Sequence, residues 1–67
     1  MLDTYELEKV IRQNGFTKKQ IAEYLNLSEQ GFLNKMQGKS EFKHSEISKL
    51  IKKLSISTDK VTAIFFN

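Results

Sequence analysis

The sequence predicts an all-α domain built from five short helices. Apolar residues recur at helical spacing in five segments, and residues that commonly cap helices precede them. The chain contains no proline, and the alternation typical of strands is not evident before the last few residues, whose conformation the pattern leaves open. The connections between the segments are short, as a compact helical domain requires. We therefore expect residues 1–67 to form a single domain.

A chain of 67 residues buries only about 60% of the surface that its unfolded form exposes, so its core must be continuous. It has no cysteine, which excludes disulfides and thiolate metal sites. Without such a covalent or metal link, we expect close helix packing, dimerisation, or both. The acidic start does not resemble a signal peptide, and no apolar run approaches the ~20 residues that span a bilayer. The expected location is the cytoplasm, away from membranes.

The sequence does not favour catalysis, a metal or a cofactor. His44 is the only histidine, and a metal site normally needs further histidine or cysteine ligands. We identify no inward-facing carboxylate pair, no nucleophile with a neighbouring base and no glycine-rich phosphate loop. We therefore expect no catalytic residue and no small-molecule substrate.

Charge is distributed unevenly along the chain. Eleven basic and eight acidic residues give a formal net charge of +3. The first eight residues carry acids and no base, whereas residues 34–53 are rich in lysine. A lysine-rich side of the molecule favours a polyanionic partner, because lysines displace condensed counterions from nucleic acid. The same lysines could be ordinary solvated helix faces, and charge alone does not decide between these interpretations.

The first predicted helix runs from about Asp3 to Asn14. Asp3 or Thr4 can cap it, and Gly15 can adopt the positive φ that ends it. The fourth helix is expected at about Ser45 to Leu54, and a last short helix begins near Ser57. Apolar residues at helical spacing predict the inward faces of these three helices, namely Leu7, Val10 and Ile11, then Ile47, Leu50, Ile51 and Leu54, then Val61 and Ile64.

Two short helices within residues 17–37 are the most informative feature. Residues 17–20 (TKKQ) form a capping-box pattern that begins the first of them. Asn26 suits a left-handed turn, Ser28 caps the second helix and Gly38 ends it. The small Ala22 lets the helices approach each other, while Leu25, Leu27 and Phe32 fill the angle between them. Such a pair can lie across a phosphate backbone and present the start of its second helix to the major groove.

The chain resembles the lambda-repressor-like (Xre/Cro) helix-turn-helix family, and more narrowly the small Cro-like and repression-modulating regulators of phages from Gram-positive bacteria. The resemblance extends from Leu7 to Phe66. It is carried by residues 17–28 (TKKQIAEYLNLS), 32–42 (FLNKMQGKSEF), 45–47 (SEI) and 64–66 (IFF). It implies a five-helix DNA-binding domain that usually acts as a dimer on a palindromic operator in a lytic–lysogenic switch of the bacterial host.

Carried over residue by residue, the resemblance places base-reading contacts at Glu29, Gln30 and Asn34. An amide such as Gln30 can pair with N6 and N7 of adenine, and Glu29 could accept a hydrogen bond from N4 of cytosine. Lys18, at the positive end of the second helix, is a candidate phosphate contact. Further phosphate candidates follow the third helix or lie in its last turn, namely Lys35, Lys39 and Lys43.

Leu33 departs from the family pattern, which commonly has a small polar residue there. On a helical wheel it shares a side with Glu29, Gln30 and Gln37. It could touch a thymine methyl group, or Leu33 and Gln37 could contact another protein. The alternative function is therefore a modulator that binds a partner repressor and alters its DNA occupancy.

Phe65 and Phe66 end the chain with two large apolar side chains. Either one closes the core while the other is half exposed, or they form a dimer contact, since an exposed apolar terminus favours pairing. The second interpretation predicts a homodimer.

Overall fold

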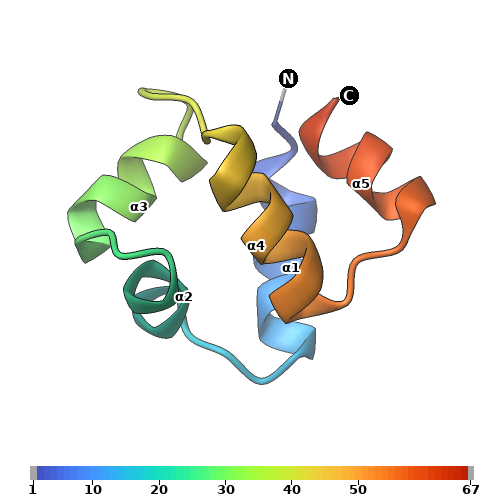
Figure 1. Ribbon diagram of the computed structural model, residues 1–67, viewed down its shortest axis with the longest axis horizontal. Helices are drawn as coiled ribbons and strands as arrows, with labels where there is room; N and C mark the ends of the chain where they lie inside the picture. Colours follow the sequence, from blue (N-terminus) through green and yellow to red (C-terminus); the bar gives the residue numbers. More distant parts are fainter. Residues whose placement is uncertain (1, 67) are drawn as a thin grey trace.

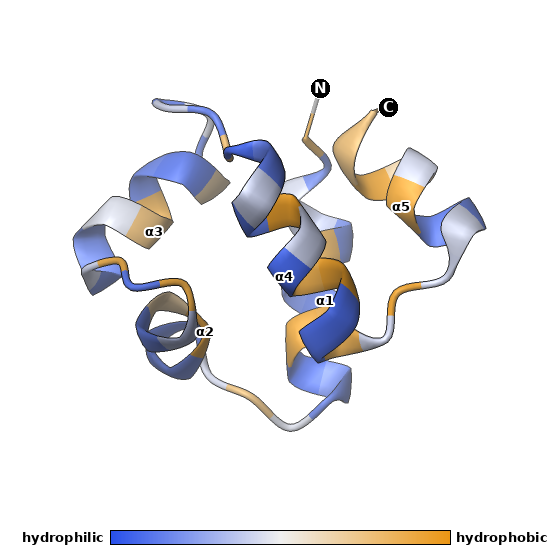
Figure 2. Cartoon of the chain, in the orientation of Figure 1, coloured by the Kyte–Doolittle hydropathy of each residue, from blue (hydrophilic) through white to orange (hydrophobic). Residues whose placement is uncertain are grey.

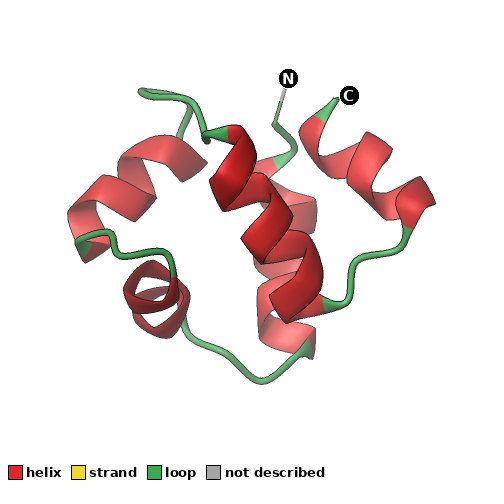
Figure 3. Ribbon diagram, viewed as in Figure 1, coloured by secondary structure: helices red, strands yellow, loops and turns green. Residues whose placement is uncertain are grey.

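The computed structural model describes residues 2–66 and contains five helices joined by short loops (Figures 1 and 3). No strand occurs within this described range, so the all-α prediction is confirmed. Met1 and Asn67, the two ends of the predicted domain, lie outside the described residues. The helices are α1 (Thr4–Gln13), α2 (Lys18–Tyr24), α3 (Glu29–Met36), α4 (His44–Leu54) and α5 (Thr58–Phe65).

Side-chain caps begin four of the helices where the sequence predicts them. Asp3, Thr17, Ser28 and Ser57 each accept a hydrogen bond from a backbone N–H three residues later. The Thr17–Gln20 capping box is complete, since the side-chain Oε1 of Gln20 also accepts a hydrogen bond from the Thr17 backbone N–H at 2.9 Å. These caps satisfy backbone donors that would otherwise lack partners at the helix starts.

Helix α4 begins differently from the expectation. Its first residue is His44, one position before the predicted Ser45. The side chain of Glu46 accepts a hydrogen bond from the Lys43 backbone N–H at 2.8 Å, so a carboxylate inside the first turn satisfies this backbone donor. An anionic side chain is also favourable there because the amino end of a helix is positive.

The inward faces of all five helices and the residue Ile56 form one core. Figure 2 shows that hydrophobic residues recur along α1, α4 and α5. Partly buried apolar side chains, including Leu27, Phe42 and Ile47, pack against this core, and Ile51 is half-buried. The fully enclosed residues include Leu7, Ile21, Phe32, Leu50 and Ile64. The predicted apolar faces are therefore confirmed except at Ile51, which is not among the apolar side chains that pack against the core.

Helices α2 and α3 pack closely and cross steeply, as their directions in Figure 1 show. Ala22 is only 1% exposed, and its small side chain lets the two helices approach closely. The intervening turn is fixed by Asn26, whose φ is +60°, and by a 2.9 Å hydrogen bond from the Leu27 N–H to the Ala22 carbonyl. The short amide side chain of asparagine tolerates this left-handed conformation better than most side chains do. The orientation of α3 relative to α2 is therefore set by the residues of the turn between them.

The beginning and end of the described chain lie side by side (Figure 1). The Asp3 backbone N–H donates to the Ile64 carbonyl at 2.7 Å. Phe42 connects this end to α3, because its ring packs edge-on against Phe32 at 5.9 Å and against Phe65 at 6.3 Å between centroids. Within residues 2–66, every helix is too short or too polar to cross a membrane.

Candidate nucleic-acid interface

One side of α3 faces away from the core. We call Glu29, Gln30, Leu33, Asn34 and Gln37 the α3 outer face. Its first two residues and Gln37 are exposed, and its other two are partly exposed. The first turn of α3 is hydrophilic (Figure 2). This helical side combines amides, a carboxylate and one leucine, and it contains all five predicted base or partner contacts on α3.

The amino end of α3 is capped without covering the outer face. The Ser28 Oγ accepts a hydrogen bond from the Gly31 N–H at 2.9 Å. Ser28 is the residue before the helix, and Gly31 lies in its first turn. A side chain at position 31 would bring its Cβ to 3.0 Å from that oxygen, so glycine leaves space for the cap. The cap therefore holds the exposed first turn of α3 in a helical conformation.

Gln30 and Asn34 are joined on the outer face. The Gln30 Nε2 donates to the Asn34 Oδ1 at 3.0 Å, a contact that side chains four residues apart on a helix can make. Each amide keeps its other function, a carbonyl on Gln30 and an amino group on Asn34, outside this bond. One acceptor and one donor are the functions that adenine requires in the major groove.

Leu33 lies between the polar residues of the outer face. It is half-buried, but it is not among the partly buried apolar side chains that pack against the core. Its remaining apolar surface is therefore available to a thymine methyl group or to a protein side chain, the two interpretations that the sequence leaves open.

The four lysines predicted as phosphate contacts have different surroundings. Lys39 and Lys43 are exposed in the loop of residues 37–43 between α3 and α4, which we call the 37–43 loop. Lys18 pairs with Glu8 at 2.7 Å, but both side chains remain substantially exposed, at 41% and 32%. Lys35 pairs with Glu46 at 2.6 Å, and those side chains are only 12% and 9% exposed. Three of the four ammonium groups thus stay accessible to solvent.

Glu46 is the buried acid of this region. Burial raises the pKa of its carboxyl, but hydrogen bonds from Lys35 and from the Lys43 backbone, together with nearby positive charge, lower it, and the resulting pKa is below the usual value. Glu46 is therefore ionised at neutral pH and balances the Lys35 charge inside the fold.

Lys53, near the end of α4, contacts two aromatic rings beside α2. The sequence pattern does not single out this lysine. Its Nζ lies 5.1 Å from the centre of the Phe16 ring and 5.0 Å from that of Tyr24. Contacts of a cation with aromatic faces are attractive at these distances. No spacing along the chain brings these three residues together, so only the fold reveals the contact.

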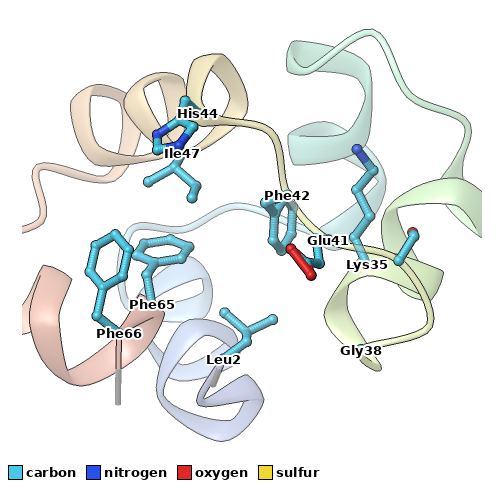
Figure 4. A pocket seen from close by; sticks show the side chains of 10 residues that line it. Leu2, Lys35, Gly38, Glu41, Phe42, His44, Ile47, Phe65 and Phe66 are labelled. Atoms are coloured by element: carbon cyan, nitrogen blue, oxygen red, sulfur yellow. The ribbon is translucent and has the colours of Figure 1, made fainter.

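A groove of about 460 Å³ opens beside the two ends of the described chain, and we call it the terminal groove. Figure 4 shows side chains from the N-terminal segment, the 37–43 loop, α4 and α5 meeting around it. Phe65 is buried, whereas Phe66 is 63% exposed at the rim. Its apolar lining consists of Leu2, Phe42, Ile47, Phe65 and Phe66.

The described residues contain no group of three metal-ligating side chains. His44 is exposed at the start of α4. The arrangement around α3 offers hydrogen-bonding amides and positive charge, which are means of binding a macromolecule.

Comparison with known proteins assigns the chain to a family without a known activity. The family model described as "Protein of unknown function (DUF739)" matches residues 3–67, nearly the full sequence. No curated protein matches the chain.

Proposed function

We propose that this chain, which belongs to the DUF739 family of proteins of unknown function, is a sequence-specific regulator that binds double-stranded DNA through a helix-turn-helix formed by residues 17–37. The observation that carries the proposal is the combination of a tightly held α3 with an outer face left free. In this interpretation α2 lies across the phosphate backbone, and the first turns of α3 enter the major groove.

The chemistry of the α3 outer face supports base reading. The paired amides of Gln30 and Asn34 keep a free acceptor and a free donor, which can pair with adenine. Glu29 can accept a hydrogen bond from N4 of cytosine. These contacts would specify sequence, whereas contacts to phosphate would only position the protein.

Accessible lysines on either side of α3 support phosphate binding. Lys18 begins α2, where the positive end of the helix adds to its charge. Lys39 and Lys43 follow α3 in the 37–43 loop. Each ammonium that contacts a phosphate releases a counterion, so binding is expected to weaken steeply with salt.

The proposal includes a homodimer on a palindromic operator whose half-sites lie about one helical turn apart. The exposed Phe66 beside the apolar terminal groove supports it, since a two-fold contact requires a surface that complements itself. Sedimentation velocity of the protein and of Phe66→Ser tests this part. A dimer that Phe66→Ser dissociates is expected, and a monomer at every concentration that allows DNA binding contradicts it.

The decisive experiment is selection of bound duplexes from a random library, followed by titration of the enriched duplex. Enrichment of a palindromic sequence is expected, with a preference over unrelated duplex of at least about a thousandfold. Gln30→Ala, which removes the amide and leaves the α3 cap, should abolish much of that preference. Failure to enrich any sequence, or the same enrichment with Gln30→Ala, contradicts sequence-specific reading by this face.

The exposed part of Leu33 favours a second candidate function, a modulator that binds a partner repressor and alters its DNA occupancy. Leu33→Ser separates the two functions. It should preserve or improve DNA binding by a direct regulator, but abolish capture of the repressor by a modulator. The resemblance to phage regulators, which act in the bacterial cytoplasm, makes a repressor encoded beside this gene the appropriate partner for a gel-shift assay.

A further inference from the structure

Lys35 has surroundings unlike those of the other lysines near α3. Its Nζ is 2.6 Å from the Glu46 Oε1, and the two side chains are 12% and 9% exposed. In the Lys18–Glu8 pair, which has a similar length, the side chains are several times more exposed. The Lys35 ammonium is therefore directed into the protein, where a close carboxylate already compensates its charge.

The Glu46 carboxylate has a second partner at the start of α4. Its Oε1 also accepts from the Lys43 backbone N–H at 2.8 Å. One oxygen atom thus connects the last turn of α3, through Lys35, to the residue that precedes α4. These two attachment points flank the 37–43 loop.

The beginning of that loop is fixed to α3 by the backbone. Gly38 has a φ of +81°, and its N–H donates to the Lys35 carbonyl at 3.2 Å. The Lys39 N–H donates to the Asn34 carbonyl at 2.9 Å. Hydrogen bonds of this kind end a helix in a defined direction. The loop is consequently held at its start by backbone bonds and at its end by Glu46.

We propose that Lys35 and Glu46 are positioning residues for DNA binding. Their ion pair holds the 37–43 loop so that the ammonium groups of Lys39 and Lys43 stand beside the α3 outer face, and Lys35 makes no phosphate contact of its own. This inference rests on the proposed function. It departs from the phosphate contact that charge alone predicts for Lys35.

The salt dependence of binding separates a phosphate contact from a positioning residue. Each phosphate neutralised by a lysine contributes about 0.9 to the slope of log affinity against log salt concentration. A residue that only orders the loop changes affinity but leaves that slope unaltered, because it releases no counterion.

The variants are chosen to keep the comparison balanced. Lys39→Gln and Lys43→Gln each remove one exposed charge. The double variant Lys35→Met/Glu46→Gln removes one positive and one negative charge, so its net charge equals that of the original protein. It also leaves no unpaired charge inside the fold, which a single Lys35 substitution would. Lys35→Arg keeps the charge and can still reach the carboxylate.

The experiment is a salt titration of each variant on a labelled random-sequence duplex of about 20 base pairs, two helical turns. Lys39→Gln and Lys43→Gln should each lower the slope by about 0.9. The double variant should keep the original slope while binding several-fold more weakly at every salt concentration, and Lys35→Arg should retain most of the original affinity.

The outcomes distinguish this inference from the proposed function. If the original protein binds no duplex even at low salt, the proposed function fails and the positioning role fails with it. If the original protein binds but the double variant loses slope as Lys39→Gln does, Lys35 is a phosphate contact and only the present inference is overturned. A double variant with unchanged slope and unchanged affinity also overturns it, because the pair then positions nothing that DNA requires.

Discussion

The two ends of α3 are held in opposite ways. At its carboxyl end, Met36 is buried, its carbonyl accepts from the Thr4 hydroxyl, and Lys35 is paired with Glu46. At its amino end, Glu29 and Gln30 are exposed, and the polar contacts of the first turn, apart from the helix's own backbone bonds, are the cap from Ser28 and the bond from Gln30 to Asn34. The carboxyl end of the helix is anchored to α1 through Thr4 and to α4 through Glu46, whereas the side chains of the amino end are free.

This difference indicates how the helix could bind a partner efficiently. Ordering a mobile segment on binding opposes association, because rotamer and backbone freedom are lost. A helix already anchored at its far end loses little freedom when its free end makes contacts. The polar functions of that free end have few internal partners, so a partner can engage them without first breaking the fold.

The largest effect is expected from truncating the main core side chain of α3. Phe32 is fully buried and packs against Phe42. Phe32→Ala should lower the free energy of unfolding by about 3–5 kcal/mol, because it removes buried apolar surface and leaves a cavity. That is most of the stability of a domain this small, which is on the order of 5 kcal/mol. Urea unfolding followed by circular dichroism measures the loss.

Leu33→Ala on the same helix is the control for that prediction. Leu33 is only half-buried and does not pack against the core, so its truncation should cost far less than that of Phe32. Equal losses in the two variants would mean that the two sides of α3 do not differ in the way the structure indicates.

The next largest effect concerns the free end and should leave stability unchanged. Gln30→Ala is expected to weaken binding to the selected duplex by about 1–3 kcal/mol, because an amide that pairs with a base carries that much discrimination. Fluorescence anisotropy measures the affinity, and urea unfolding verifies the fold. Gln13→Ala, an exposed glutamine on α1, is the matched control. A similar loss of affinity in both variants would contradict base reading by Gln30.

The anchored and free ends also differ in how well the sequence predicts them. Ser28, Asn26 and the Thr17–Gln20 box act on neighbouring backbone atoms, so residue type and spacing are sufficient to predict them. The α3 outer face likewise follows from helical periodicity alone. Whether its side chains read bases remains a prediction, since neither the fold nor the family match tests it.

Contacts between distant residues could not be predicted in this way. Lys35 and Glu46 are 11 positions apart, and nothing in their neighbourhoods distinguishes Lys35 from Lys39 or Lys43. The start of α4 differs from the expected Ser45 by one residue, because Glu46 accepts a hydrogen bond from the Lys43 N–H and makes position 43 the boundary. For Lys35, by contrast, the role of the side chain depends on a partner that only the three-dimensional fold brings near.

A smaller effect is expected where the cap of the free end is removed. Ser28→Ala should lower the free energy of unfolding by about 1 kcal/mol, because the Gly31 N–H loses its acceptor. Ser57→Ala, in the corresponding position before α5, is the comparison. Its oxygen is 3.4 Å from the Lys60 nitrogen, a longer and weaker bond, so the loss should be smaller. Thermal unfolding of both variants gives the order, and the reverse order would contradict the hydrogen-bond argument.

The smallest effect is a dependence of stability on pH that tests the anchored end. The pKa of Glu46 in the folded protein is below its ordinary value of 4.5. The unfolded chain therefore takes up this proton first as the solution is acidified. The stabilisation is present above the pKa of the unfolded state and disappears as the pH falls through the pKa of the folded state.

Unfolding free energies measured from pH 7 down to acid should decline less steeply for Glu46→Gln than for the original protein. Glu6, a partly exposed acid whose pKa is lowered chiefly by its hydrogen bond from Lys9 and also by that from Lys60, supplies the comparison through Glu6→Gln. Both substitutions should flatten the decline. Only the charge-balanced Lys35→Met/Glu46→Gln, which removes the same carboxylate without leaving Lys35 unpaired, should also weaken DNA binding, because only Glu46 holds the 37–43 loop. An unaltered acid dependence in Glu46→Gln would mean that its carboxylate is not the charged partner of Lys35.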